Sequence, residues 1–188
     1  MGFQPKSYRI APPVYFEVDY TLLGECVTGC GSVTFMYNGS EVTYGTVTGA
    51  NEHCWLDRNP GAAQEAETGT DAEDYGDYFR FDDAVNACPG DFRLATEAEW
   101  EAEIASWESE DSAGAFKSPL KLPVAGYRSS ESNGWIIGNR YNGHYCSDTV
   151  VDGSRSRSLH FDISSASLDS DFRASGLSVR CLKEVTSD

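Results

Sequence analysis

Hydrophobic positions at helical spacing predict two helices in the middle of the chain. Between residues 81 and 88, an aromatic residue, an alanine, a valine and a cysteine stand at i, i+3, i+4 and i+7. This spacing forms one apolar stripe along a helix. A Pro-Gly pair then ends the run. The pattern therefore predicts a helix over residues 81–88.

The second helix has a sharper start. Thr96 and Glu99 form a capping box, in which the Thr96 hydroxyl accepts the backbone N–H of Glu99 and the Glu99 side chain reaches back to Thr96. Trp100, Ile104 and Trp107 follow as its inner stripe. After Trp107 the chain is predicted to loosen into a loop and an extended, proline-punctuated segment. These helices serve as a scaffold, with no catalytic pattern of their own.

Alternating apolar and polar positions predict strands on both sides of the helices. Residues 14–23 and 32–47 alternate in this way, and the Asn38-Gly39 pair is typical of a tight hairpin turn. Further short strand-like runs stand at residues 54–56, 144–148, 157–163 and 176–182. The fold class is therefore α+β. A change of character near Tyr44 divides an N-terminal β-rich segment, residues 1–44, from a domain over residues 45–188.

Composition excludes several classes of function. The 188-residue chain has 30 Asp and Glu against 14 Lys and Arg, for a net charge of −16. A nucleic-acid partner is not expected, because phosphate recognition needs a basic surface. No apolar run is long enough for membrane insertion, and the first residues lack the apolar stretch of a signal peptide. Acidity of this kind favours solubility in a salty or crowded setting.

Six cysteines are an even number in a short chain, which permits disulfides. Cys26 and Cys30 have the spacing of half a zinc site, but no second Cys/His pair follows at finger spacing. A local disulfide and two unpaired thiols are the remaining interpretations. No metal site and no cofactor are expected, although the carboxylates of residues 148–171 leave a structural calcium ion open.

Five motifs in series resemble a known fold family over Tyr44 to Glu184. They are CWLDRNPGA, DYGDYFRF, CPGDFRLATEAEWE, SPLKLPVAGYR and GLSVRC. The series resembles the bacterial and phage branch of the C-type lectin fold. That branch includes the Fibrobacter major paralogous domain, relatives of the formylglycine-generating enzyme, and the variable proteins of diversity-generating retroelements.

The resemblance implies a C-type lectin-like fold, with two helices and a small, twisted, mainly antiparallel sheet. It also implies that Cys88 and Cys181 come close enough for a disulfide. Two buried thiols are the alternative in a reducing compartment. The calcium-binding sugar motifs of animal lectins on this fold do not occur in the sequence, so the resemblance implies no calcium-dependent sugar site.

Enzyme-like features are weak. The formylglycine-generating enzyme uses a local cysteine pair, whereas Cys146 and Cys181 stand far apart. His144, Cys146 and Asp148 supply a base, a thiol and a carboxylate, but on a strand they share one face as surface side chains. No catalytic residue is assigned, and the protein is not expected to be an enzyme.

Residues 133–175 are the most informative stretch after the helices. In the resembling variable proteins, this segment has its codons rewritten by adenine-directed mutagenesis. An Asn codon then gives Ser, Asp, Gly, Tyr, His, Cys, Arg or Ile, and these types crowd here. Aromatic anchors among small polar residues are also typical of a recognition surface. The alternative is an ordinary loop-rich half of the fold, with Trp135, Ile137 and Tyr141 buried.

The sequence therefore predicts a non-enzymatic protein that binds a protein or glycan ligand on a cell surface, and that works on a virion or cell surface. The N-terminal segment would be an attachment or oligomer arm, which leaves a homo-oligomer open. The alternatives are a formylglycine-generating-type oxidoreductase and an invariant adhesion domain. The candidate ligand contacts are Trp135, Ile137, Arg140, Tyr141, Asn142, His144, Cys146, Asp148, Arg155, Arg157, His160, Asp162, Asp169, Asp171 and Phe172.

Overall fold

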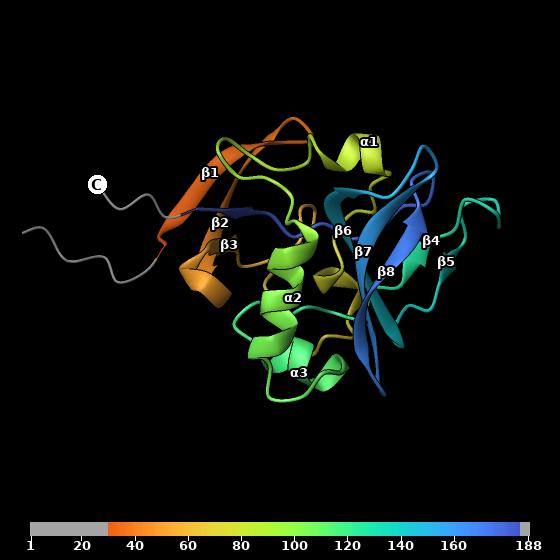
Figure 1. The fold of residues 1–188 in the computed structure, drawn as a ribbon. Helices are drawn as coiled ribbons and strands as arrows, with labels where there is room; N and C mark the ends of the chain where they lie inside the picture. The colour runs from red at the N-terminus through yellow and green to blue at the C-terminus, as the bar shows by residue number, and fades with distance from the viewer. Residues whose placement is uncertain (1–29, 185–188) are drawn as a thin grey trace, which may run out of the picture.

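The computed structural model describes residues 30–184 (Figure 1). The strand expected over residues 14–23, and Cys26, lie outside the described residues. The described chain is α+β, with three helices and several small antiparallel sheets. Within residues 30–184, no helix has the length and apolar character that crossing a bilayer requires.

A four-stranded antiparallel sheet has the strand order β1-β2-β3-β9. Its strands are β1 (Ser32–Tyr37), β2 (Ser40–Thr48), β3 (Cys54–Leu56) and β9 (Leu182–Lys183). The predicted hairpin turn is confirmed: Asn38 and Gly39 both have positive φ, at 48° and 81°. Strand β2 pairs with β1 on one side and with β3 on the other, so it runs through the boundary expected near Tyr44.

The second half of the chain supplies the other strands. A three-stranded antiparallel sheet consists of β6 (Asn142–Val150), β7 (Arg155–Asp162) and β8 (Ala166–Phe172). Beside it, β4 (Tyr127–Arg128) pairs with β5 (Ile136–Ile137). Two short 3₁₀ helices, η2 (Ala50–Glu52) and η3 (Ala72–Asp74), complete the connections. In Figure 1 the β4–β5 pair and β1 lie at opposite sides of the molecule.

Helix α1 is shorter than the sequence predicts. It covers only Phe81–Ala84. The Val85 N–H still bonds to the Phe81 carbonyl, but those of Asn86 and Ala87 bond to the carbonyls three residues back, so the α-helix does not continue. Val85 is 49% exposed and does not share the buried side of Phe81 and Ala84. The predicted single stripe from residue 81 to residue 88 is wrong beyond Ala84.

Helix α2 (Glu97–Ser106) confirms the second prediction. Both halves of the capping box are present between Thr96 and Glu99. Trp100 is fully buried, with its ring 4.9 Å from that of Trp55 on β3. Helix α3 (Ser112–Lys117) replaces part of the predicted loop. Its start is fixed by the Asp111 side chain, which accepts two backbone N–H groups.

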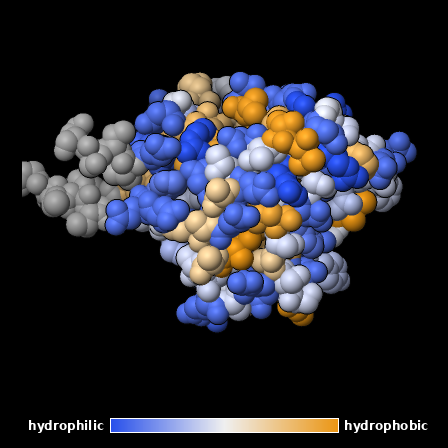
Figure 2. All heavy atoms as spheres, viewed as in Figure 1, coloured by the Kyte–Doolittle hydropathy of each residue, from blue (hydrophilic) through white to orange (hydrophobic). Residues whose placement is uncertain are grey.

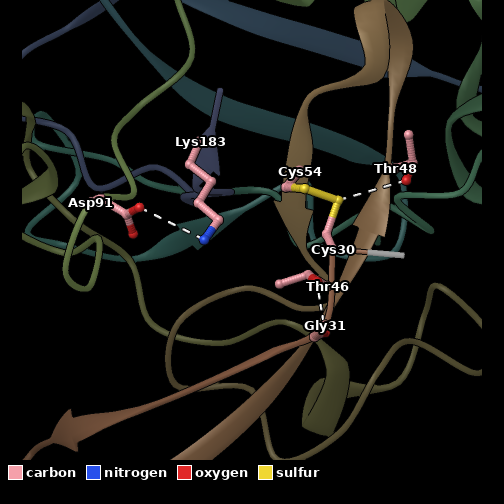
Figure 3. The surroundings of a disulfide bond; sticks show 7 residues. All are labelled: Cys30, Gly31, Thr46, Thr48, Cys54, Asp91 and Lys183. Atoms are coloured by element: carbon pink, nitrogen blue, oxygen red, sulfur yellow. Dashed lines mark hydrogen bonds and ion pairs between the residues drawn. A yellow bond between two sulfur atoms is a disulfide. The ribbon is translucent and has the colours of Figure 1, made fainter. Parts of the chain in front are cut away.

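Two disulfides tie the elements together. Cys88–Cys181 forms as the resemblance implied. The other bond joins Cys30 to Cys54 on β3, so the expectation of a local Cys26 partner or a free thiol at Cys30 is wrong (Figure 3). Antiparallel pairing of β2 with β3 places Cys54 beside the end of β2, within reach of the chain that leads into β1. Two disulfides are consistent with an extracellular location.

Candidate ligand-binding surface

The β6–β7–β8 sheet separates two environments. Its inner face carries Tyr145, Leu159 and Phe161, all fully buried in the core that includes Trp100 and Trp107. The Phe161 ring lies edge-on to Trp107, with 6.0 Å between the centroids. Because side chains alternate along a strand, the residues between these point to the other side. We call that side the outer face.

Three rings form a row across the outer face. Tyr127 on β4, His144 on β6 and His160 on β7 follow one another, with 4.6 Å between each pair of neighbouring centroids. Antiparallel register explains the row, because His144 and His160 stand directly opposite each other. The backbone N–H of Gly126 donates to the Asn142 carbonyl, which holds β4 against the start of β6. The row is thus built from residues distant in sequence.

Asp171 joins all three strands of the sheet. One of its carboxylate oxygens lies 3.0 Å from Nδ1 of His144 on β6 and accepts the Ser158 hydroxyl of β7 at 2.8 Å. Burial by itself raises the pKa of Asp171, but the hydrogen bonds from His144 and Ser158 outweigh it, so the pKa lies below its usual value. The carboxylate is therefore held ionised on the outer face.

For His160, burial is the dominant influence on the pKa, and the nearby carboxylates only partly oppose it. Burial lowers its pKa below the usual value, and the neighbouring His144 adds to the effect, against the nearby carboxylates of Asp162, Asp171 and Asp169. His160 is therefore held as a neutral ring at neutral pH, close to three carboxylates.

Exposed apolar residues border this face. Trp135 is 74% and Tyr141 75% exposed, which makes them the most exposed aromatic side chains within residues 30–184. Ile136 and Ile137 of β5 are exposed between them. Burial of Trp135, Ile137 and Tyr141, the alternative considered from the sequence, does not occur. In the view of Figure 2, hydrophobic residues stand in small groups among polar ones, so the surface is mixed in character.

The loop that carries these residues is fixed by close backbone approach. Gly126 has φ +68°, and a Cβ there would lie 2.2 Å from the Ile137 carbonyl oxygen. The backbone N–H of Arg140 donates to the Val124 carbonyl at 2.8 Å. Arg140 itself has φ 72° and an exposed side chain. The apolar residues are therefore displayed on a constrained support.

Most predicted contacts lie on this one surface, which we call the recognition surface. The outer face and its bordering loop hold Trp135, Ile137, Arg140, Tyr141, Asn142, His144, His160, Asp162, Asp169 and Asp171. Sequence reasoning missed two members, Tyr127 and Ile163. Tyr127 has no local signal and is recognised only through its contact with His144. Ile163, an exposed isoleucine in the polar turn after β7, carries a signal in the sequence.

Three predicted contacts lie on the inner, helix-side face instead. Arg157 forms an ion pair with Glu97 of α2 at 3.0 Å. Arg155 stacks over the Phe172 ring at 4.1 Å and donates to the Ser170 carbonyl. Strand parity explains the separation, because these positions alternate with those of the outer face. The structure does not bring Arg155, Arg157 and Phe172 together with the histidines.

Two further expectations are corrected. Cys146 is only 2% exposed and packs in the second core cluster with Leu177 and Val179, so its side chain is not a surface contact. Burial raises the pKa of its thiol to about 12. A register shift after Cys146 carries Asp148 away from the outer face, toward the start of α2, where its backbone N–H bonds to Ala95. His144, Cys146 and Asp148 do not form one exposed face.

The remaining enzyme-like features do not assemble. Within residues 30–184, no group of three or more His, Cys, Asp or Glu side chains is arranged to hold a metal ion. His53 lies 3.3 Å from Glu99 of α2 and is not part of the ring row. No protein-family model, curated protein or solved structure matches the chain.

Proposed function

We propose that the protein is a non-enzymatic binding protein and that the recognition surface is its ligand site. The observation that carries this proposal is the exposure of Trp135 and Tyr141 on a constrained loop beside the ring row. Large aromatic side chains supply contact area at little entropic cost, because few torsion angles need to be fixed. Such residues are enriched at the centres of binding sites.

The chemistry of the surface favours a protein ligand over a glycan. Ile136 and Ile137 are exposed next to the aromatic pair, and aliphatic side chains gain most from apolar partners. Asp169, His160 and Asn142 supply polar groups around them. Apolar anchors with polar surroundings are the usual anatomy of a protein interface. A virion or cell-surface setting fits this role and the two disulfides.

We further propose that the scaffold is a C-type lectin-like fold of the kind found in the variable proteins of diversity-generating retroelements. The series of motifs, the two predicted helices at their expected places and the Cys88–Cys181 bond support this assignment. The outer positions of residues 133–175 would then be the diversified ones. An invariant adhesion domain would use the same surface with fixed residues.

An oxidoreductase of the formylglycine-generating type has less support. That chemistry needs a reactive cysteine pair. Cys181 is bonded to Cys88, and Cys146 is buried with a raised thiol pKa. A thiol that is hard to ionise is a poor nucleophile.

Sequencing the encoding locus from many individuals of the source population tests the proposal. Substitutions should concentrate in the loop at Trp135 and Tyr141 and at outer positions such as His144 and His160. The intervening inner positions, such as Leu159, should stay constant. Equal variation on both faces of the strands would contradict a diversified binding surface. An unchanging segment would favour the adhesion domain.

A further inference from the structure

The ring row on the outer face is the middle of a longer row that crosses five strands. In the β4–β5 pair, Ile137 stands directly opposite Tyr127, so their side chains share one face. At the other end of the row, His160 stands opposite Ser167 of β8. A parallel backbone bridge joins the β4–β5 pair to β6 (Figure 1). The row therefore leads from an exposed isoleucine, over three rings, to an exposed serine.

Carboxylates gather at the histidine end of this row. Asp162, Asp171 and Asp169 all lie close enough to His160 for their charges to oppose the larger effect of burial on its pKa. Asp162 follows His160 by two positions on β7, whereas antiparallel pairing places Asp169 of β8 beyond His160 in the other direction. Asp169 is exposed and Asp162 is partly exposed. Negative charge is thus presented to solvent on both sides of a neutral ring.

Local hydrogen bonds hold two of these carboxylates in place. The Ser164 hydroxyl and the backbone N–H groups of Ser164 and Ser165 donate to one oxygen of Asp162, and these bonds lower its pKa. One oxygen of Asp169 accepts the Ser170 N–H at 2.7 Å. Each carboxylate uses the same single oxygen for all of these bonds, so a ligand can bind the other oxygen.

A neutral ring between carboxylates fits a cationic side chain. Lysine and arginine form charge-assisted hydrogen bonds with carboxylates, and the faces of aromatic rings attract cations. The same carboxylates repel an anionic group. The net charge of −16 also favours encounter with a basic partner over an acidic one.

We propose, building on the proposed function, that the ligand is a basic protein segment that places a lysine or arginine at His160 and an apolar side chain at Ile137. Three strand spacings separate these two positions, which is about 14 Å. An extended segment rises about 3.3 Å per residue, so the two ligand residues stand about four positions apart. An even separation puts both side chains on one face of the segment.

Selection on the full chain from a phage-displayed library of random linear peptides tests this inference. Enriched peptides should combine an aromatic or aliphatic residue with a lysine or arginine about four positions away. Synthetic copies are then measured by isothermal titration calorimetry. Replacing the basic residue of such a peptide by glutamine should weaken its binding by about fivefold.

The double variant Asp162→Asn and Asp169→Asn should weaken binding of the basic peptide by about five- to tenfold. The variant removes both charges, and each asparagine keeps the oxygen that accepts the local hydrogen bonds. Binding of the glutamine peptide should stay unchanged. Glu101→Gln with Glu110→Gln, at exposed positions on and after α2, removes the same net charge and is the matched control, which should change neither affinity. Melting temperatures verify that both double variants are folded.

Three outcomes would overturn the inference. Enriched peptides that lack a basic residue but lose affinity for Tyr141→Ala would exclude the cationic partner and leave the proposed function standing. Basic peptides weakened equally by the control variant would show attraction to net charge and not to this site. A selection that yields no peptide dependent on Tyr141 or on the two aspartates would overturn the inference and the proposed function together.

Discussion

The two faces of the β6–β7–β8 sheet come from the same strands but differ in the side chains they carry and in how those side chains are packed. On the inner face Tyr145, Leu159 and Phe161 are fully buried in the apolar core, where the Tyr145 hydroxyl also donates to the Pro123 carbonyl. On the outer face the His144 ring and the Asp171 carboxylate lie within hydrogen-bonding distance of each other, and their side chains are 12% and 20% exposed. The inner face is therefore built from apolar packing, whereas the outer face also contains polar and titratable groups that remain partly exposed.

The largest expected effect tests the inner face. Trp100→Ala should destabilise the protein by about 3–5 kcal/mol, because it removes a fully buried ring that contacts Trp55 and Tyr145. The loss of its indole bond to the Cys146 carbonyl adds to the cost. Chemical denaturation followed by fluorescence and circular dichroism measures the change. A loss below about 1 kcal/mol would mean that this core tolerates a cavity.

The second-largest expected effect is a pH dependence of stability caused by Glu103. Its pKa is raised in the fold, whereas the pKa of Asp171 is lowered. Glu103 of α2 is buried, with one oxygen accepting the Ala50 N–H at 2.6 Å. Burial raises its pKa to about 7, although the hydrogen bonds oppose the shift. The folded state then holds a proton that the unfolded chain releases, so stability should fall by about 3 kcal/mol as pH rises from 4.5 to 7.

Glu103→Gln should remove this dependence, because the amide keeps an acceptor oxygen and does not ionise. Denaturation curves of both proteins between pH 4 and pH 8 measure the difference. Parallel curves for the two proteins would show that Glu103 is ionised in the fold. Glu101→Gln, at an exposed position of the same helix, is the matched control.

On the outer face, His160 should give a smaller pH dependence of stability with the opposite sign. Because the pKa of His160 is lowered in the fold, the unfolded chain binds its proton first as pH falls below 6.5. Stability from this group is therefore present above pH 6.5 and lost as pH falls through the folded pKa. His160→Gln should remove this contribution.

Imidazole NMR titration measures the same effect directly, since the chain contains only three histidines. His144→Gln should move the titration of His160 upward by removing its neighbour. An unchanged titration in that variant would mean that the two rings do not interact.

The smallest stability effect should accompany the largest binding effect. Tyr141→Ala and Arg140→Ala change exposed side chains, so the free energy of unfolding should stay within about 0.5 kcal/mol. Ligand binding should weaken instead, measured by surface plasmon resonance once a ligand is in hand. Glu131→Ala, at an exposed position before the same loop, is the control. If either variant melted like Trp100→Ala, the surface would be part of the core.

Local patterns were sufficient for part of the structure. The capping box at Thr96, the inner stripe of α2 and the Asn38-Gly39 turn depend on neighbours within a few residues, and all three are confirmed. The resemblance, a longer-range signal, correctly paired Cys88 with Cys181. Most residues of the proposed recognition surface lie in the stretch that the sequence singled out, because residue types typical of binding sites cluster there.

Only the tertiary structure decided which of those residues share a face. Packing against Leu177 and Val179 buried the Cys146 thiol, and a register shift after Cys146 moved Asp148 aside. Tyr127 belongs to the ring row because it contacts His144 on β6, a strand fifteen or more residues away. Cys30 forms its disulfide with Cys54, on the far side of β2. Sequence periodicity records which residues alternate, whereas register between distant strands depends on packing of the whole core. The sequence by itself thus determined the start of α2, the turn and the stretch proposed for recognition, and the packed fold determined which of its side chains lie together.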